Sequence, residues 1–317
     1  MSARPSTITS RPDGDRNVAT PAFEIGLLVL LSLIWGSSFT LIKIAVDAIP
    51  PLTMVTARAA IAASLLIAIA RGYGLALPRD RSTWFAFFVQ GLLQSALPFT
   101  LISWGEMHIG SGLAGVLNAT PPMFVLLLAM ATGNSGQRIA ARKIIGVGLG
   151  LAGVLVTIDL QSLRDLDTAA PLAQFAVLGA SLCYALAPIW GRRFRGLPDI
   201  VTAAGAMSCA AATMLPAALV LETPWRLTPP PSAIAAVIVL GVVCTAIAMV
   251  IYFRLIRTLG ALGVTSGSYL RAGFAVILGT LFLGESFTWW NSLGMALILI
   301  GVVAVTLPPS WIKAGTH

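Results

Sequence analysis

Charged residues are scarce in this chain. Asp, Glu, Lys and Arg together make up 10% of its 317 residues, whereas 57% are hydrophobic and the mean hydropathy is +0.90. A soluble globular domain has about a quarter charged residues, so the composition excludes a soluble enzyme, a disordered chain and a coiled coil. The apolar residues lie in runs of about twenty, the length that crosses ~30 Å of hydrocarbon. The sequence therefore predicts an all-α polytopic membrane protein.

Cysteine and histidine are also rare. The three cysteines, Cys183, Cys209 and Cys244, lie within apolar runs, so we expect free thiols that pack as small hydrophobic groups. The two histidines, His108 and His317, do not share the spacing of metal ligands with cysteines or acids. We expect no disulfide framework, no metal site and no cofactor.

Motifs for catalysis, nucleotide binding and conduction are missing as well. A serine protease needs a histidine that activates a buried serine, and the segment 263–267 (GVTSG) is not convincing as a nucleophile turn. The absence of a phosphate-binding loop excludes ATP-driven pumping within this chain, and no ring of like charge indicates a channel. We expect a protein that is not an enzyme. A membrane sensor that transports nothing stays open as an alternative, although no soluble domain is present for signalling.

The charge that is present is mostly positive, with 20 Lys and Arg against 12 Asp and Glu, a net charge of +8. Membrane proteins gather basic residues in cytoplasmic loops, so we expect a lipid bilayer as the partner and no nucleic acid. If the N-terminus lies inside, only Lys43, Arg164 and Arg226 fall at outer ends, while Arg58 and Arg271 fall within spans and all others lie inside. This asymmetry predicts a multi-pass protein of the inner (plasma) membrane with both termini cytoplasmic.

The sequence contains ten apolar runs, which predict ten transmembrane helices. The runs span residues 22–44, 51–71, 84–104, 110–131, 142–158, 172–191, 200–221, 232–253, 260–282 and 289–307. Residues 1–21 lack the basic region that runs directly into the apolar stretch of a signal peptide, so we predict a disordered cytoplasmic tail there. A second cytoplasmic tail is expected over residues 308–317.

The chain matches itself at an offset of 148 to 150 residues. Matched pairs include Leu33-Ile34-Trp35 with Leu182-Cys183-Tyr184, Gly91 with Gly241, Ser95 with Thr245, Gly146 with Gly294, and Gly153 with Gly301. Each repeat holds five helices, an odd number, so the second copy must enter the membrane from the opposite side. Two inverted five-helix repeats, 22–158 and 172–307, are typical of secondary transporters, although gene duplication also builds membrane proteins that move nothing.

Three stretches resemble motifs of the EamA-type branch of the drug/metabolite transporter superfamily, and the resemblance covers residues 22 to 307. They are Leu33-Ile34-Trp35-Gly36-Ser37-Ser38-Phe39, then Pro50-Pro51 with Ala57-Arg58, and finally Leu281-Phe282-Leu283-Gly284-Glu285 followed by Gly294 and Ile300-Gly301-Val302. The resemblance implies a ten-helix inverted-repeat fold with a central cavity. It also implies export of small metabolites, among which amino acids and their analogues are frequent, and proton-driven transport in many members.

The chain departs from the family pattern in two places. The first half has no acid where the second half has Glu285, which puts a coupling role of Glu285 in doubt. Arg271 stands where the ninth helix of the family usually has a proline, whereas the first half keeps Pro121-Pro122 at the matching place. The arginine is the more informative departure.

Arg271 is the strongest candidate for a binding residue. A charge in mid-membrane costs ~2.5–3.5 kcal/mol on insertion scales, so it should face a cavity or a partner. The planar guanidinium could clamp a carboxylate or phosphate; pairing with carbonyls at a helix end is the structural alternative. For Arg58, whose long stem could reach an interface, we favour a structural role.

Several polar residues could complete the site. Pro121-Pro122 must interrupt the fourth helix, and Asn118 and Thr120 just before it could bind substrate or satisfy the freed carbonyls. Gln90 and Gln94 share one helix face; bonding between helices is the alternative role, and Gln94 is the deeper candidate.

The repeat-related aromatics Trp35 and Tyr184 could face each other around an apolar group or a cation, or simply pack. We expect Trp35, Tyr184 and Tyr269 to line the apolar part of the site, and Ser268 to add a polar contact beside Gln94 and Asn118.

Candidates for a proton-binding group are poor. Glu24, Glu106, His108 and Glu285 all lie at helix ends, where we expect them to be solvated, so exchange or facilitated transport is an alternative to proton coupling. The glycines of residues 146–153 could serve packing within the bundle or contact in a homodimer, and packing within the bundle is the favoured interpretation.

The sequence as a whole predicts a secondary active transporter that exports small amphipathic metabolites bearing a carboxylate, such as amino acids or their analogues. Arg271 would hold the anionic group, and the halves would rock around the site by alternating access. A multidrug-type exporter of apolar cations is the alternative function.

Overall fold

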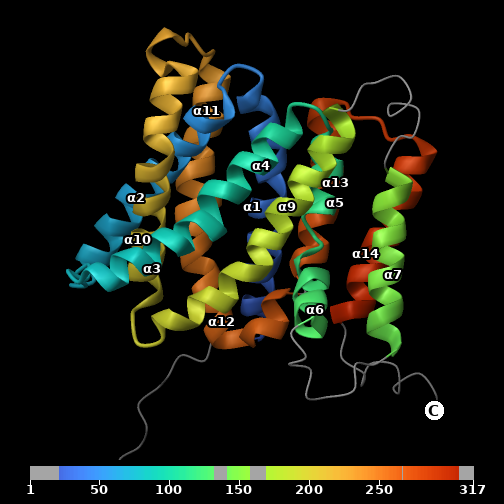
Figure 1. Cartoon of the computed structure of the whole chain (residues 1–317), viewed down its shortest axis with the longest axis horizontal. Coiled ribbons are helices and arrows are strands. Elements are labelled where there is room, and N and C mark those ends of the chain that lie inside the picture. Colours follow the sequence, from blue (N-terminus) through green and yellow to red (C-terminus); the bar gives the residue numbers. More distant parts are fainter. Residues whose placement is uncertain (1–20, 132–140, 158–168, 266, 307–317) are drawn as a thin grey trace, which may run out of the picture.

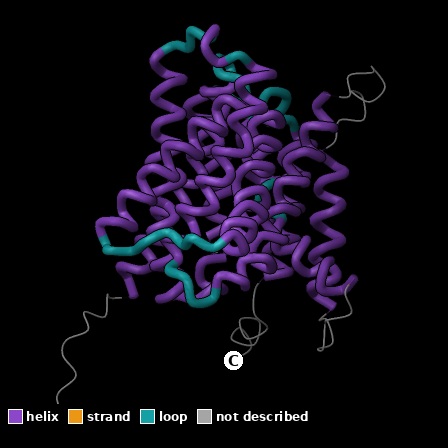
Figure 2. The backbone as a smooth tube through the Cα atoms, turned by 60° about the vertical axis from the view of Figure 1, so that its left-hand side comes forward, coloured by secondary structure: helices purple, strands orange, loops and turns teal. Residues whose placement is uncertain are grey.

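The computed structural model describes residues 21–131, 141–157, 169–265 and 267–306, and every regular element within these ranges is a helix (Figures 1 and 2). The first half contains α1 (Pro21–Val46), α2 (Pro51–Gly72), α3 (Arg81–Gly91), η1 (Leu92–Ala96), α4 (Leu97–Glu106), α5 (Ser111–Leu117), α6 (Pro121–Ala131) and α7 (Ala141–Thr157). The second half contains α9 (Ala169–Gly191), η2 (Arg192–Phe194), α10 (Asp199–Ala217), η3 (Ala218–Glu222), η4 (Pro224–Arg226), α11 (Pro231–Gly241), η5 (Val242–Ile247), α12 (Ala248–Thr265), α13 (Gly267–Leu283) and α14 (Trp289–Thr306).

Seven stretches of the described chain are long and apolar enough to cross a membrane. They are Ala22–Val46, Pro51–Gly72, Arg81–Glu106, Ser111–Leu128, Ala169–Phe194, Asp199–Glu222 and Pro231–Leu255. Two shorter apolar helices, Gly267–Leu283 and Trp289–Val305, follow them. These lengths confirm a multi-pass helical protein. The tails expected at residues 1–21 and 308–317 lie outside the described residues apart from Pro21.

Proline sets several helix boundaries. α2, α6 and α11 each begin on a proline, namely Pro51, Pro121 and Pro231, because the first position of a helix needs no N–H donor and the ring already holds the required φ. The expected interruption of the fourth apolar run is confirmed, since α5 ends at Leu117 and α6 starts at Pro121. Irregular backbone at this depth is tolerated only beside protein or a water-filled cavity.

Glycines let the helices approach closely. Figure 1 places α7 and α14 side by side at one edge of the bundle, where a Cβ on Gly146 would lie 2.8 Å from the Gly301 carbonyl oxygen and one on Gly153 would lie 2.7 Å from that of Gly294. Gly146 and Gly153 of α7 therefore pack within the bundle, the interpretation favoured from the sequence, whereas nothing lies within 4 Å of a Cβ on Gly148.

The two halves pack on each other through matched contacts. Gly91 of α3 lies against the backbone of Ala206 in α10, and Gly241 of α11 lies against the backbone of Arg58 in α2. Gly91 and Gly241 are the repeat-related pair, and each is followed directly by a π-helical turn, η1 or η5. Equivalent elements of the two halves thus make equivalent close contacts across the molecule.

Candidate functional site

Arg271 lies on α13 and reaches the break between α5 and α6. Its Nη2 donates to the backbone oxygen of Asn118 at 2.8 Å and to the Asn118 side-chain oxygen at 3.3 Å. Its Nε is buried and has no hydrogen-bond partner among the described residues. The guanidinium therefore uses one side to hold the end of α5 and leaves a buried donor without an acceptor. The structure brings together Arg271 and Asn118, two of the predicted site residues.

The carbonyls freed at the break are satisfied by neighbouring side chains. The Leu117 oxygen accepts the Thr120 hydroxyl at 2.7 Å and the Ser181 hydroxyl of α9 at 3.2 Å. Thr120 thus satisfies the local backbone, one of the two roles left open by the sequence. Asn118 turns its side-chain amide oxygen toward Arg271. The unpaired Nε–H donor of Arg271 therefore lies near the end of α5, a helix that α9 and α13 both contact.

Tyr184 lies one turn beyond Ser181 on the same face of α9, because residues three apart on a helix are neighbours. It is half-buried and packs on the largest hydrophobic cluster. Tyr184 therefore follows Ser181, which contacts the end of α5, along α9.

Arg58 does not reach an interface, since its side chain is 4% exposed in the interior of the bundle. Its Nε donates to the Thr245 hydroxyl of η5 at 2.9 Å, and its guanidinium lies 3.8 Å from the ring centroid of Phe99 in α4. Thr245 in turn donates to the Leu240 carbonyl at 2.8 Å. Two neutral partners from two helices hold this cation; the sequence favoured a structural role for it but did not identify these partners.

The other predicted aromatic and hydroxyl residues are spread more widely. Trp35 of α1 packs against Tyr252 of α12, with ring centroids 5.5 Å apart, and no ring contact joins it to Tyr184 in the described structure. Tyr269 of α13 donates its hydroxyl to the Val302 carbonyl of α14 at 3.2 Å, which turns it toward α14. Ser268, next to it, is half-buried.

Gln90 and Gln94 bond to each other along one helix. The Gln90 amide donates to the Gln94 side-chain oxygen at 2.6 Å, and the Gln94 amide approaches the Met249 sulfur of α12 at 3.9 Å. The strong bond lies within one helix, and only the weak sulfur contact joins two helices. Gln94 is half-buried and lies on the π-helical turn η1.

The interpretation of the glutamates as solvated helix ends is wrong for Glu106. Its side chain is fully buried at the end of α4, and neither carboxylate oxygen has a hydrogen-bond partner among the described residues. The Lys43 ammonium of α1 donates to the backbone oxygen of Glu106. Neighbouring segments can thus bury an acid that lies at the end of an apolar run. The position of the acid along the run does not reveal this burial.

Glu285 is a helix cap. It accepts the backbone N–H groups of Ser111 at 2.6 Å and of Gly112 at 3.0 Å, and so joins the α13–α14 loop to the start of α5. Gly110 and Gly279 leave the room its carboxylate needs, because a Cβ on either would lie within 3.1 Å of it. Glu285 is therefore engaged with first-half backbone.

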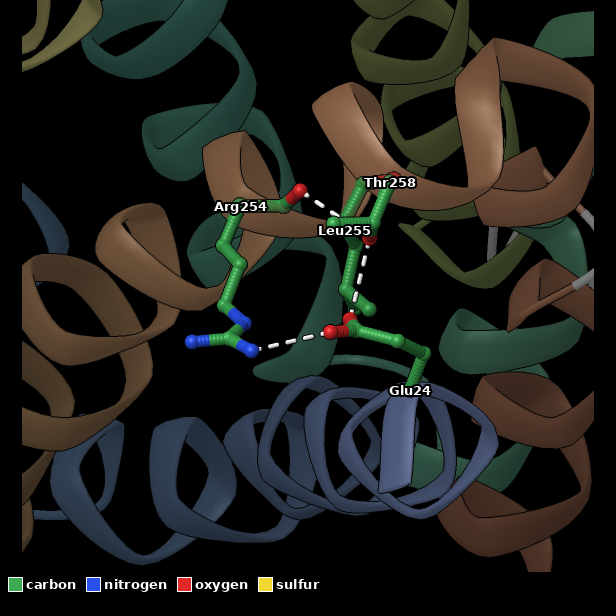
Figure 3. A network of polar contacts seen from close by, with 4 residues as sticks. All are labelled: Glu24, Arg254, Leu255 and Thr258. Carbon is green, nitrogen blue, oxygen red and sulfur yellow. Dashed lines mark hydrogen bonds and ion pairs between the residues drawn. The ribbon is translucent and has the colours of Figure 1, made fainter. Parts of the chain in front are cut away.

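Glu24 lies in the first turn of α1 and contacts α12. It is also buried, so the interpretation as a solvated helix end is wrong for it as well. Figure 3 shows Arg254 and Thr258 of α12 directed at its carboxylate, each at 2.9 Å. Glu24 is 4% exposed. The contacts of Glu24 and Glu285 both join the two halves of the chain, and they lie at opposite ends of the bundle.

A family profile described as "EamA-like transporter family" matches residues 22–158 and again residues 171–307. The chain belongs to the EamA-like transporter family. This membership confirms the resemblance read from residues 33–39 and 281–302, and it makes the chain a membrane transporter of the drug/metabolite type.

Relatives and solved structures cover nearly the whole chain. The "Uncharacterized inner membrane transporter YedA" of Escherichia coli (strain K12) is 31% identical over 285 residues, 89% of this EamA chain and 90% of its own length. The "Probable terminal-alkyne amino-acid exporter" of Streptantibioticus cattleyicolor is 27% identical over 280 residues, 88% and 91% of the two chains. A crystal structure with 19% identity superposes with a TM-score of 0.59 over 90% of this chain and 97% of that chain, which shows likeness of fold alone.

Proposed function

We propose that this EamA-family protein is a secondary active transporter that exports small amphipathic metabolites bearing a carboxylate, such as amino acids and their analogues. It would lie in the inner membrane with both termini in the cytoplasm. The observation that carries the proposal is Arg271 in the second turn of α13, because its Nε–H is buried without a hydrogen-bond partner and no acid is paired with it among the described residues. The relative named as an amino-acid exporter supports the substrate class.

The proposed mechanism is alternating access between two inverted five-helix repeats, residues 22–158 and 172–307, which together form ten transmembrane helices. The matched contacts of Gly91 and Gly241 support a pseudo-symmetric frame. Glu24 with Arg254, and Glu285 with Ser111, would open in turn, because both contacts join the halves and they lie at opposite ends of the bundle. A symmetric frame gives its two open states similar free energies.

Within this frame Arg271 would bind the carboxylate through the N–H groups that Asn118 does not use. Asn118, Gln94 and Ser268 would offer polar contacts, and Tyr184, Trp35 and Tyr269 would line the apolar part. The two rings pack on different parts of the protein. Trp35 contacts Tyr252 of α12, whereas Tyr184 packs on the largest hydrophobic cluster. The apolar part of the site would therefore need the halves to move before both rings contact one substrate.

The test is a thermal-shift screen of the full chain in detergent, with amino acids, organic acids and apolar cations as probes. A ligand at ~100 times its Kd stabilises the fold by about 2.7 kcal/mol. We expect a carboxylate compound to stabilise the wild type but neither Arg271→Ala nor Arg271→Lys, because lysine keeps the charge and loses the planar fork. Arg254→Lys is the matched control at an arginine that already has an acid partner, and it should still respond.

Each of the other possible outcomes would indicate a different role for Arg271 or a different function for the protein. Equal stabilisation of the wild type and both Arg271 variants by carboxylates would make Arg271 structural. Stabilisation by apolar cations only would favour the multidrug-type exporter. Saturable flux of the stabilising compound in proteoliposomes is required as well, and its absence would favour a membrane protein that transports nothing.

Proton coupling through Glu106 is part of the proposal. A buried carboxyl with no hydrogen-bond partner is costly when charged, and an ionisable group inside a membrane protein is a functional candidate. We expect Glu106→Gln to retain exchange of substrate across proteoliposomes and to lose accumulation driven by a pH gradient. Asp80→Asn is the control, because that acid is an exposed cap of α3 and takes no part in either contact that is proposed to open. Gradient-driven accumulation by Glu106→Gln would exclude Glu106 as the coupling group.

A further inference from the structure

A pocket lies between the last turns of α2 and the segment 73–80, which leads to α3. Its volume is about 410 Å³. Two arginines and several apolar residues line it together, among them Ile67, Ala70, Arg71, Leu75, Leu77 and Arg79. None of the residues of the candidate site around Arg271 lines this pocket. It therefore joins charged and apolar surface in a second place on the molecule.

Hydrogen bonds fix the segment that forms one wall of the pocket. The Leu75 N–H donates to the Ala70 carbonyl at 2.9 Å, and Gly74 between them has a φ of 71°. This left-handed conformation is a common way to end a helix, and glycine adopts it without strain. Further along, the Trp84 indole N–H donates to the Pro78 carbonyl at 2.9 Å. The chain thus holds the pocket in a defined shape.

The apolar lining is part of a packed cluster. Ala70 of α2 is buried with Phe87 of α3 and Phe194 of η2. Leu75 and Leu77 pack against the same cluster from the segment 73–80. The apolar side of the pocket is therefore supported from behind by three elements. Such a surface favours a ligand with a hydrocarbon part, because removing apolar area from water is favourable.

The two arginines of the pocket have no acid of their own. Arg71 and Arg79 are exposed, and neither side chain makes a hydrogen bond or an ion pair with any residue that the structure describes. Asp80, the neighbour of Arg79, accepts the Thr83 N–H instead. Two guanidinium groups on one pocket present the planar sets of donors that bind phosphate oxygens. The charge of the pocket therefore complements an anionic phosphate group.

The pocket lies where two membrane spans end. Arg71 is in the last turn of the span Pro51–Gly72, and Arg79 precedes the span Arg81–Glu106. The polar headgroups of a bilayer lie at this level, and basic pockets at the cytoplasmic ends of membrane helices bind acidic lipid headgroups. In the orientation proposed above this end faces the cytoplasm. The place of the pocket therefore favours a lipid over a soluble ligand.

We propose that this pocket binds one anionic phospholipid, with its phosphate held by Arg71 and Arg79. Ile67 lies one turn deeper than Arg71 on the same face of α2, so an acyl chain would pass over it into the bilayer. A soluble phosphate compound would use the arginines and leave the apolar lining uncovered, whereas a phospholipid covers both. The inference goes beyond the proposed function, because it concerns a resident lipid and not the cargo.

Two lipids with the same acyl chains test the proposal. The Kd of the first bound phosphatidylglycerol is measured on the full chain in a neutral detergent by native mass spectrometry, and it is compared with that of phosphatidylcholine. Each basic residue near a membrane surface strengthens the attraction of an anionic lipid about fivefold. We therefore expect the wild type to bind phosphatidylglycerol at least about tenfold more tightly.

Variants separate the pocket from general attraction by the basic end of the bundle. The double variant Arg71→Gln/Arg79→Gln should reduce the preference to less than about threefold. The matched control, Arg192→Gln/Arg195→Gln, removes the same charge from exposed arginines in and next to η2 that do not line the pocket, and it should keep the preference. Ala76→Trp retains both pocket arginines and fills the space between them and the apolar lining, so it should also lower the affinity for phosphatidylglycerol at least about fivefold.

Three results would overturn the inference. The first is a wild type that binds the two lipids equally. The second is an equal loss of the preference in both double variants, which would indicate diffuse attraction; Ala76→Trp with unchanged affinity would indicate the same, and it decides the question if Arg71→Gln/Arg79→Gln does not fold. The third is displacement of phosphatidylglycerol by an equal concentration of inorganic phosphate at constant ionic strength, which would indicate a site for soluble anions.

Discussion

Ser95 in η1 and Thr245 in η5 occupy repeat-related places, and each contacts one side chain of the neighbouring helix from the other half. Ser95 lies 3.4 Å from the Met207 sulfur of α10, whereas Thr245 accepts a hydrogen bond from Arg58 of α2 at 2.9 Å. The same contact therefore carries an apolar side chain in one half and a charge in the other.

Two further pairs show the same asymmetry. Arg271, in the second turn of α13, corresponds to Pro121, the first residue of α6, and Arg271 donates to Asn118 just before that helix. Gly36, where α1 crosses α13, corresponds to Ala185 on α9. The repeat-related helices are positioned alike in the two halves. The interior charges, which a substrate would contact, occur where the two halves differ in sequence.

The largest effect is expected where α1 and α13 touch. A Cβ on Gly36 would lie 2.6 Å from the Phe274 Cβ and 2.9 Å from the Arg271 carbonyl oxygen, so Gly36→Leu should destabilise the protein at or beyond the upper end of the ~1–3 kcal/mol typical of overpacking. Gly26→Leu on the same helix, where nothing lies within 4 Å, is the control. Thermal unfolding in detergent measures both, and equal midpoints would show that this crossing is not tight.

An intermediate effect should separate the two repeat-related hydroxyls. Thr245→Val leaves a buried charged donor without its acceptor, which costs about 1–3 kcal/mol. Ser95→Ala removes only a contact to sulfur and should cost less than about 1 kcal/mol, since such contacts are weak. Reversible unfolding in mixed micelles compares the two. A larger loss for Ser95→Ala would contradict the assignment of the asymmetry to Arg58.

The smallest effect concerns the starts of α3 and α11. Asp80 accepts the Thr83 N–H at 2.7 Å, whereas the repeat-related Pro230 has no side-chain cap. This hydrogen bond lowers the pKa of Asp80, so the cap is fully present above the unfolded pKa of about 4 and is lost as the pH falls through the lower folded value. Asp80→Ala should lower the midpoint slightly at pH 7 and not at pH 2. An equal loss at both pH values would show that the cap is not electrostatic.

Much of the fold could be predicted, because apolar runs and prolines act locally. The break at Pro121 and the free thiols follow from chemistry within a few residues, and the packing of Gly146 follows from its repeat-related glycine in α14. These features need no knowledge of which helices meet.

The remaining features depend on contacts between distant segments. Position along an apolar run indicates depth, but it does not show that other segments cover Glu106 or that Trp35 packs on Tyr252. Arg58 was interpreted as structural, with a stem that could reach an interface, and its contact with Thr245 could not be predicted because that partner lies 187 positions away.

The large separation of Arg58 and Thr245 along the sequence also has a consequence for biogenesis. α2 enters the membrane with its arginine long before the ribosome has made η5; at about 5–20 residues per second the partner follows roughly 10 to 40 s later. During that interval the helix carries a charge that costs ~2.5–3.5 kcal/mol on insertion scales. The nascent first half is therefore a natural client for whatever shields polar helices in the bilayer, and it becomes independent of such help only when the second half arrives.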